Sequence, residues 1–444
     1  MGKETEKQIL TTLFSALNDS KLEYCVLRNY RELPDTLGGS DLDIAVLPEQ
    51  LGEITAIIKK VLGNLGGKVI IDYDASLKVL RFLGCWKGVW WGLAVDIFSK
   101  IEYKGVEYIS TQNLLSRVEE YNNIKISPDY DADTLALIKE LLSNGKTRKN
   151  YFGNAVSAYN KFGRKSLALL EGGFSTGLIE RFESLLLRGE ENLSAISAVA
   201  TEFRQEVTRG RAPSKTIKKI NNLFLRLQRV YRPPGFSLAV LGTDGSGKST
   251  MIERVTPILE DVLHATIQYE HLRPNWLPAL GVATGQREAN SNIPVPDPHS
   301  QKPSGFFGSI IRLSYYSLDY IIGYWVKIYP SLVRSPHICI FDRYHYDLVV
   351  DPRRMRIQLP TWVIKLFLYV APKPKLIICL GGNPEVIYGR KPETTLEEVE
   401  RQTEALKNFC QKTSNAVWID TSCNLSDSEN QVMQCISDYC SISS

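Results

Sequence analysis

The clearest chemical signal in the sequence is the glycine-rich run GTDGSGKST at 242–250, which fits the pattern GxxxxGK[ST]. Glycines there let backbone N–H groups converge on phosphate oxygens, and a helix after them presents its positive N-terminal end. A lysine can reach the β- and γ-phosphates of a nucleotide, and the hydroxyl after it can bind Mg²⁺. An ordinary turn between strand and helix is the alternative. We predict a nucleotide-binding loop made of Gly242, Asp244, Gly245, Ser246, Gly247, Lys248, Ser249 and Thr250.

A carboxylate and an arginine stand at the end of another apolar run. Asp342 closes the run HICIF, and Arg343 follows it directly. In a doubly wound sheet the carboxyl ends of the strands are where ligand groups lie. Asp342 is therefore a candidate catalytic residue and metal ligand, although a strand-end aspartate can also serve only as a helix N-cap.

Taken together, GTDGSGKST and FDRYHYD resemble the thymidylate-kinase family of P-loop kinases, over roughly residues 236–444. The resemblance implies Mg·ATP-dependent phosphoryl transfer, with ATP and Mg²⁺ as cofactors. It also implies that Lys248 and Ser249 hold ATP and Mg²⁺, and that Asp342 and Arg343 organise the metal and the acceptor.

The resemblance extends to a lid over the phosphates. The segment NPEVIYGRKPE is similar to a later segment of that family, and it would place Arg390 and Lys391 in the lid. Positive charge there would stabilise the charge that spreads over the transferring phosphoryl oxygens. Arg390 is thus a fourth candidate catalytic residue, with Lys248, Asp342 and Arg343.

The acceptor is left open by the sequence. The nearest family substrate is a nucleoside monophosphate such as dTMP, but the usual acceptor-site sequence is replaced by HLRP at 271–274 and PVPDPHS at 294–300. This version also looks like kinase-like proteins among surface-polysaccharide enzymes, which would phosphorylate a saccharide or polysaccharide end. A third possibility is a regulatory protein that binds ATP without phosphorylating anything. Arg273 and Arg353 are candidate substrate contacts.

One helical face adds further candidates for acceptor binding. Arg312, Tyr316, Asp319 and Gly323 follow at i, i+4, i+7 and i+11, which places them on one side of a helix. An inward-facing arginine and aspartate must be paired or must bind a ligand. We expect Arg312 and Tyr316 to contact the substrate, or else Arg312 and Asp319 to form a structural ion pair.

A second group of carboxylates lies near the N-terminus. Asp41 and Asp43 precede the run IAVL, and Asp96 sits inside GLAVDIF. Alternate strand residues face the same way, so Asp41 and Asp43 can share a cation, and an adjacent strand carrying Asp96 would complete a Mg²⁺ site. This pattern resembles the nucleotidyltransferase fold of the DNA polymerase β type, over roughly residues 1–150.

One departure from that fold leaves the activity of the domain open. The resemblance leads us to expect a Gly-Ser pair before the Asp-x-Asp, but this sequence has LRNY at 27–30. Arg28 would then contact phosphate instead, or the domain would bind a ligand without catalysing a second, nucleotidyltransferase reaction.

The elements that must position these residues indicate an α/β protein of three parts. Strand-length apolar runs separated by helical patterns occur at 236–241, 338–341, 376–380 and 416–419. The N-terminal part alternates strand patterns at 43–47 and 93–98 with helical patterns at 9–17, 54–62 and 133–142, whereas the middle is helical throughout. We predict a nucleotidyltransferase-like α+β domain over 1–150, a helical connector over 151–232, and a P-loop kinase domain with a parallel sheet over 233–444.

Composition excludes several classes of protein. The chain has 444 residues, 43% hydrophobic and 23% charged, which are globular proportions, and its 53 basic and 49 acidic residues give +4. The excess lies in residues 151–232, with 14 basic against 7 acidic residues. Nucleic acid is disfavoured as a partner, since the balance is near neutral and no aromatic residues interleave the basic ones. We expect a cytoplasmic protein with no signal peptide, no membrane span, and reduced cysteines.

Overall fold

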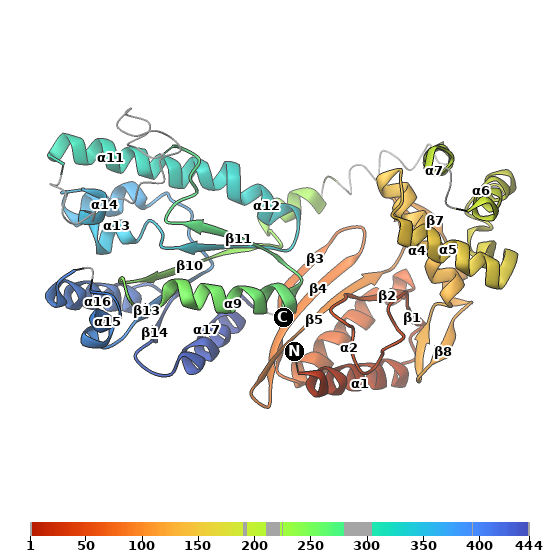
Figure 1. The fold of residues 1–444 in the computed structure, drawn as a ribbon, viewed down its shortest axis with the longest axis horizontal. Helices are drawn as coiled ribbons and strands as arrows, with labels where there is room; N and C mark the ends of the chain where they lie inside the picture. The colour runs from red at the N-terminus through yellow and green to blue at the C-terminus, as the bar shows by residue number, and fades with distance from the viewer. Residues whose placement is uncertain are drawn as a thin grey trace. The chain divides into compact units, whose positions relative to one another are not determined.

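The computed structural model describes residues 2–189, 193–209, 223, 225–278, 304–392 and 394–442, with only the backbone at 193, 194 and 353. The chain forms two compact units, Met1–Gln228 and Arg229–Ser444, and each contains its own β-sheet (Figure 1). The protein is therefore of mixed α/β type. We describe the two units separately.

The first unit is built on a seven-stranded mixed sheet with the order β3-β4-β5-β2-β1-β9-β8. Its strands are β1 (Tyr24–Val26), β2 (Leu42–Val46), β3 (Gly67–Asp74), β4 (Lys78–Trp86), β5 (Val89–Phe98), β8 (Glu119–Tyr121) and β9 (Ile124–Ile126). The strands β6 (Ile101–Tyr103) and β7 (Val106–Ile109) pair with each other. The neighbours β2 and β5 run parallel, in a register that sets Asp43 opposite Asp96. The predicted strand next to Asp43 is thus confirmed as β5.

The helices of this unit cover both faces of the sheet. They are α1 (Lys3–Asp19), η1 (Pro48–Gln50), α2 (Leu51–Asn64), α3 (Thr111–Leu115), α4 (Asp129–Asn144), α5 (Lys149–Phe162), η2 (Gly163–Leu170), α6 (Thr176–Arg188) and α7 (Leu193–Arg209). Alternation along β2 divides the core: Ile44 and Val46 pack with α1 and α2, and Ala45 packs with α4. The carboxylates at the start of β2 are therefore held in place by a strand buried on both faces.

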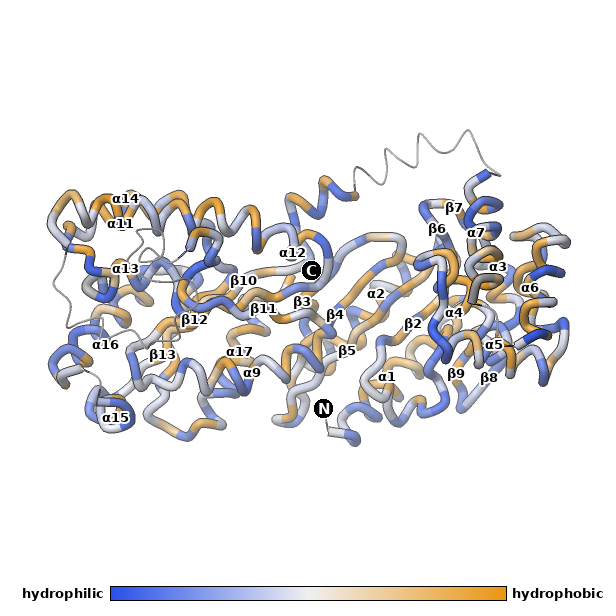
Figure 2. Tube along the Cα trace, turned by 45° about the horizontal axis from the view of Figure 1, so that its top comes forward, coloured by the Kyte–Doolittle hydropathy of each residue, from blue (hydrophilic) through white to orange (hydrophobic). Residues whose placement is uncertain are grey.

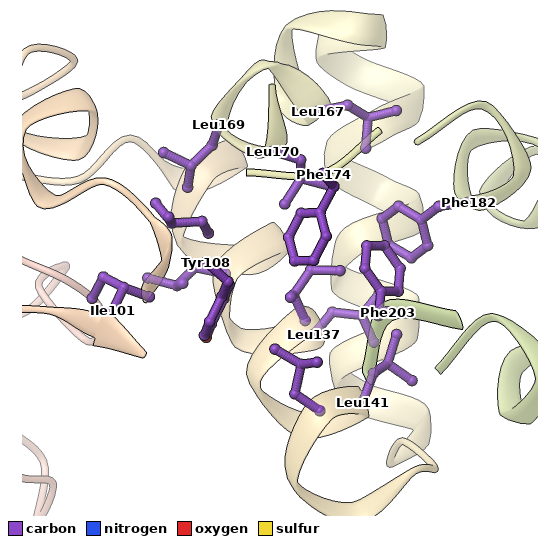
Figure 3. Packing of buried hydrophobic residues seen from close by; sticks show 14 of the residues in the cluster. Ile101, Tyr108, Leu137, Leu141, Leu167, Leu169, Leu170, Phe174, Phe182 and Phe203 are labelled. Carbon is purple, nitrogen blue, oxygen red and sulfur yellow. The ribbon is translucent and has the colours of Figure 1, made fainter. Parts of the chain in front are cut away.

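The middle of the chain differs from the expected separate connector. Its described helices α5, α6 and α7 share one hydrophobic core with α4 and with residues of β1 and β2 (Figure 3). Phe203 stacks edge-on against Phe174 and Phe182, with ring centroids 4.7 and 5.4 Å apart. The helical apolar spacing that suggested a connector thus buries these helices against the first unit.

The second unit contains a five-stranded parallel sheet with the order β11-β12-β10-β13-β14. The strands are β10 (Phe236–Gly242), β11 (Thr266–His271), β12 (His337–Asp342), β13 (Leu376–Gly381) and β14 (Ala416–Asp420). Four of them confirm the predicted apolar runs, and the parallel sheet is confirmed with them. The edge strand β11 was not predicted, because its sequence TIQYEH is mostly polar.

Helices cover both faces of this sheet as well (Figure 1). They are α9 (Lys248–Leu263), α11 (Phe306–Leu318), the π-helix η4 (Asp319–Ile328), α12 (Tyr329–Arg334), α13 (Asp347–Val350), η5 (Pro352–Met355), α14 (Thr361–Leu368), α15 (Pro384–Arg390), α16 (Leu396–Gln411) and α17 (Leu425–Cys440). The core on one face joins α11, η4, α13, α14 and α16 to β10, β12 and β13. The predicted loop 285–305 lies outside the described residues, except for 304 and 305.

Two further expectations concern the chain as a whole. All eight cysteines are free thiols, as expected for a reduced protein, and Cys339 and Cys379 are buried in their strands. Among the helices that the structure describes, none is long and apolar enough to span a bilayer.

Candidate functional site

The glycine-rich loop joins the end of β10 to the start of α9. Gly245 and Gly247 have φ values of +85° and +84°, a backbone region that side chains disfavour. Gly242 is confined in another way, since a Cβ there would lie 2.3 Å from Ser246 Oγ and 2.6 Å from the Leu380 carbonyl oxygen. The sequence therefore forces a tight loop directly before a helix N-terminus, which is the arrangement that favours bound anions.

Lys248 is the first residue of α9 and is buried. Its Nζ donates a hydrogen bond of 2.8 Å to the carbonyl oxygen of Thr243 and lies 3.9 Å from Asp244 Oδ1. Burial and the charge of Arg343 lower the pKa of Lys248 to about 8. Its positive charge is thus poorly compensated in the ligand-free protein, and an anion at the loop would stabilise it.

A network of charges links the loop to the end of β12. Asp244 forms ion pairs with Arg343 and with Arg354, the latter at 2.8 Å. Arg343 also donates to Asp347 at 2.8 Å and to the carbonyl oxygen of Gly242 at 3.2 Å. Burial opposes ionisation of Asp244, but the charges of Arg343 and Arg354 outweigh it and hold the pKa of Asp244 well below its usual range.

Asp342 ends β12 on the strand next to the loop-bearing β10. Tyr269 donates to its Oδ2 at 2.9 Å, and His271 Nδ1 lies 3.6 Å from the same oxygen. Burial would raise the pKa of Asp342, yet hydrogen bonding to His271 and the charge of Lys248 leave that pKa below its ordinary value. Its Oδ1 is buried and accepts no hydrogen bond from any described residue.

This buried, unpartnered oxygen fits the expected magnesium ion. Mg²⁺ prefers hard oxygen ligands and usually binds one or two protein groups together with phosphate oxygens. Asp342 and the exposed hydroxyl of Ser249 would hold the ion, and Thr250 is exposed beside Ser249. Bound there, the ion would neutralise charge on the nucleotide phosphates.

The predicted lid residue Arg390 lies at the C-terminal end of α15. Its side chain is exposed, and Nη2 donates to the carbonyl oxygen of Thr421 at 2.8 Å. The chain just after α15 lies against the glycine loop, since a Cβ at Gly245 would come within 3.3 Å of Lys391 Cβ. The residue next to Arg390 in the sequence, Lys391, therefore lies close to the glycine loop, whereas the Arg390 guanidinium contacts the segment after β14.

The candidate acceptor contacts are partly redistributed by the structure. Asp319 is fully buried, and its partners are Arg273 at 2.8 Å and the backbone N–H of Leu277 at 2.7 Å. Arg312 instead donates to Ser304 Oγ at 2.8 Å. The predicted ion pair between Arg312 and Asp319 is therefore wrong, because Arg273 pairs with Asp319 instead. Arg273 lies in a loop far away in the sequence, so helical spacing could not indicate it.

The remaining acceptor candidates have the following positions. The buried Arg273 also donates to the carbonyl oxygens of Leu277 and Pro278, so it holds the loop after β11 in place. The ring of Tyr316 lies 5.8 Å from the Arg273 guanidinium carbon. Gly323 allows the same loop to approach, since a Cβ there would lie 2.9 Å from Trp276 Cβ. The backbone of Arg353 lies in η5, and its side chain is outside the described part of the chain.

The N-terminal carboxylates do come together, but arginines contact them. Asp43 is buried and forms an ion pair with Arg28. On the neighbouring strand Asp96 pairs with Arg81 at 2.8 Å, and Arg81 lies 3.7 Å from Asp41. Among the described residues no group of three or more His, Cys, Asp or Glu side chains is arranged to hold a metal ion. Oδ1 of Asp43 is buried without a hydrogen-bond partner among the described residues, as Oδ1 of Asp342 is. Arg28 and Arg81 contact other carboxylate oxygens of the cluster, so the three side chains together do not fit the Mg²⁺ site expected at Asp41, Asp43 and Asp96.

A cavity of about 560 Å³ lies in the first unit beside this cluster, between the segment 28–40 and helices α4 and α5. Arg28 and Arg31 line it, together with Ser40 and Asp129. Arg28 and Asp43 also line a neighbouring pocket with Lys139, whose pKa is lowered by burial. The larger cavity also has Glu32 and Asp133 in its lining, and its Arg31 pairs with Asp129, so it carries no excess of positive charge. The neighbouring pocket, which Lys100 and Glu102 also line, does have such an excess and could take an anionic ligand.

Comparison with known proteins adds no family. No protein-family model matches the chain, and no curated protein matches it. The function is therefore argued from the sequence and the geometry alone.

Sequence reasoning did not single out three residues of the second unit's site. Asp347 and Arg354 complete the charge network around Arg343 and Asp244, and Tyr269 binds Asp342. The sequence held a weak signal for the first two, because both follow DRY within a dozen residues in a run rich in charge. Tyr269 gave none, since it lies on the strand that was not predicted.

Proposed function

We propose that the second unit transfers a phosphoryl group from Mg·ATP to a small acceptor, as the thymidylate-kinase resemblance implies. The observation that carries the proposal is the pairing of the glycine loop with the unpartnered Oδ1 of Asp342 on the adjacent strand. A magnesium ion beside the nucleotide phosphates would give this buried carboxylate oxygen the partner that it otherwise lacks. The strand order, with the loop strand β10 in the middle, supports the same function.

In this proposal each side chain acts on charge and position. Lys248 exchanges its bond to Thr243 for phosphate oxygens of ATP, which restores its full positive charge. Arg343 and Arg354, oriented by Asp244, face the charge that develops on the transferring group. Asp342 and Ser249 would hold the magnesium ion, and Arg390 would join from the segment after β13.

For the acceptor, the cations around the loop favour an anionic molecule, and a nucleoside monophosphate is the class closest to the resemblance. Arg343 and Arg354 both lie on the β12 side of the loop, and their charges are balanced by Asp244 and Asp347 while no substrate is bound. An acceptor phosphate would compete with these carboxylates for the guanidinium groups.

The test measures ADP release by the full chain with dTMP, other nucleoside monophosphates, and simple or polymeric saccharides as acceptors. We expect turnover with a monophosphate, and a loss of about a thousandfold in Lys248→Ala and in Asp342→Asn. Lys407→Ala, an exposed lysine on α16, is the matched control and retains activity. Turnover only with saccharides would move the acceptor to the surface-polymer class, and full turnover in Lys248→Ala would refute the mechanism.

A second candidate function belongs to the first unit. We propose that it has the nucleotidyltransferase-type fold but binds an anionic ligand without a metal-dependent reaction. The pairing of Asp43 with Arg28 and of Asp96 with Arg81 supports this, since cations already contact the carboxylates. Calorimetry with pyrophosphate in EDTA, on the Lys248→Ala chain, tests it. We expect binding that is lost in Arg28→Gln, and binding that required Mg²⁺ would contradict the proposal.

A further inference from the structure

The second unit exposes an unusual row of large apolar side chains along α11 and η4. Phe307, Ile311 and Leu318 follow at steps of four and seven residues, which is one face of an α-helix. Ile322 and Val326 continue the row in η4, and all five side chains are exposed, Phe307 by 79% and Ile311 by 66%. The opposite side of the same helix, with Leu313 and Tyr320, is buried in the core.

The helix α14 carries a second row of exposed apolar side chains. It contacts α11, and both helices carry long hydrophobic stretches (Figure 2). Trp362 and Leu366 of α14 and Val370 just after it are exposed by 64–69%, at steps of four residues, and Tyr369 at the end of the helix is exposed too. Together these two rows, which we call the α11–α14 face, exceed what scattered surface apolar residues explain.

The charges of this part of the chain all have one sign at the surface. Residues 304–373 contain no glutamate, and each of their four aspartates is buried, three of them in the ion pairs and hydrogen bonds described above. Their exposed charged side chains are Lys327, Arg334, Lys365 and Lys373. Lys327 is compensated by an ion pair with Glu270 at 2.8 Å, which leaves Arg334, Lys365 and Lys373 as the basic groups that could meet a partner. Lys365 lies on α14 itself, one residue before Leu366.

Large apolar residues combined with surface charge of only positive sign match one kind of partner, an anionic lipid surface. Aromatic residues such as Trp362 and Tyr369 favour the boundary between head groups and acyl chains, and each nearby lysine gains from negative lipids. A second copy of the chain is a poorer match, because a two-fold contact would bring Lys365 and Lys373 toward their own copies. The charge therefore selects the lipid.

We propose that the α11–α14 face binds the surface of membranes that contain anionic lipids, without crossing them. The apolar rows insert among the head groups, and the basic side chains pair with lipid phosphates. The proposal does not depend on the phosphoryl transfer proposed above, so either can fail alone.

The test is co-sedimentation of the full chain with vesicles of phosphatidylcholine and phosphatidylglycerol in about equal parts, against vesicles of phosphatidylcholine alone. We expect binding to the mixed vesicles and at least tenfold weaker binding to the neutral ones. Binding should also weaken several-fold from 0.15 M to 1 M salt, because the screening length falls from about 8 to about 3 Å.

Two pairs of substitutions locate the surface. Phe307→Ser with Trp362→Ser should weaken binding to mixed vesicles by about tenfold or more. Leu425→Ser with Tyr439→Ser is the matched control, since both residues are exposed apolar side chains on α17, and it should bind as the parent does. If the wild-type chain does not co-sediment with the mixed vesicles, the proposal is overturned. Self-association that Phe307→Ser abolishes, with no vesicle binding, would assign the face to a second copy.

Discussion

At the scale of single residues, the most informative group is Lys248, because its charge is unfavourable in the ligand-free fold. Its folded pKa is about 8, against an unfolded value of 10.5. Between these two values the unfolded chain binds the proton and the folded chain does not, so the stability of the ligand-free fold rises with pH in that window. Below pH 8 the buried charge destabilises the fold, and a bound phosphate would remove that penalty.

This gives a prediction for Lys248→Met. The variant should be more stable than the parent at pH 7, on the order of 1–3 kcal/mol, since it removes a desolvated charge. It should also lack the gain in stability that the parent shows between about pH 8 and pH 10. Calorimetric melting at several pH values measures both effects, and a parent curve that is flat over this window would contradict the assigned pKa.

The same residue predicts how nucleotide affinity depends on pH. Above about pH 8 the free enzyme must take up a proton on Lys248 before it binds phosphate, so the Kd for ATP should rise by up to tenfold per pH unit. Titration calorimetry in buffers of different ionisation enthalpy would detect the proton uptake. The Lys248→Met variant serves as the control, because it has no proton to take up.

In the first unit, Asp43 and Arg28 should respond unequally to substitution. Burial raises the pKa of Asp43 despite the charge of Arg28, so ionised Asp43 is destabilising on balance. Asp43→Asn should be neutral or stabilising, with a benefit that grows as pH rises above about 4. Arg28→Met should lower stability by roughly 1–3 kcal/mol, less than for a fully buried pair because Arg28 is partly exposed. Urea denaturation measures the free energy of unfolding of both variants. A larger loss of stability in Asp43→Asn than in Arg28→Met would contradict the prediction.

At the scale of elements, alanine substitutions at two positions of the glycine loop separate the cost of backbone strain from the cost of a steric clash. An added Cβ at Gly245 would meet both a positive φ and the Ile387 carbonyl oxygen at 2.6 Å, whereas Gly247 has the positive φ but open space. Gly247→Ala should lower stability by about 1 kcal/mol, and Gly245→Ala by clearly more. Gly389→Ala, in α15 with neither problem, should be neutral or slightly stabilising. Equal losses of stability in Gly245→Ala and Gly247→Ala would mean that α15 moves away from the loop and relieves the steric conflict at Gly245.

Three of the four predicted strands in the second unit share one physical property, and the fourth, β14, is an edge strand that is only partly buried. Strands β10, β12 and β13 are buried throughout, so each appears as an unbroken apolar run. The edge strand β11 has polar Gln268 and Glu270 and shows no such run. The neighbouring strand that carries Asp96 was also predicted, and its register sets Asp96 opposite Asp43.

Partners supplied from a distance could not be predicted. Arg28 and Arg81 reach the N-terminal carboxylates from other segments, and Arg273 takes Asp319 from a loop 46 residues earlier. Asp319 was expected to have a partner, and Asp43 and Asp96 were expected to bind Mg²⁺, but spacing arguments see only neighbours within one helix or strand. The identity of the cation therefore required the fold.

At the scale of the whole molecule, the charge imbalance did not indicate which unit the middle helices belong to. The basic segment 151–232 suggested a connector, but charge reports only the solvated faces of helices. The buried faces of α5, α6 and α7 carry the apolar side chains that join them to α4, and these determine which unit they belong to. The boundary between the two units falls between Gln228 and Arg229, four residues before the predicted end of the basic segment at 232.

This assignment predicts how fragments of the chain behave. A fragment that ends after Asn150 loses Phe174, Phe182 and Phe203, and it exposes Leu137 and Leu141 of α4, which pack in the same core. Exposure of several large apolar side chains costs on the order of 1.5–3 kcal/mol each, comparable in sum to the total stability of a domain. The fragment 1–150 should therefore aggregate or unfold without cooperativity, whereas 1–228 should unfold in one cooperative transition followed by circular dichroism. Cooperative unfolding of 1–150 would instead mean that this fragment is a complete domain and that α5, α6 and α7 only pack against its surface.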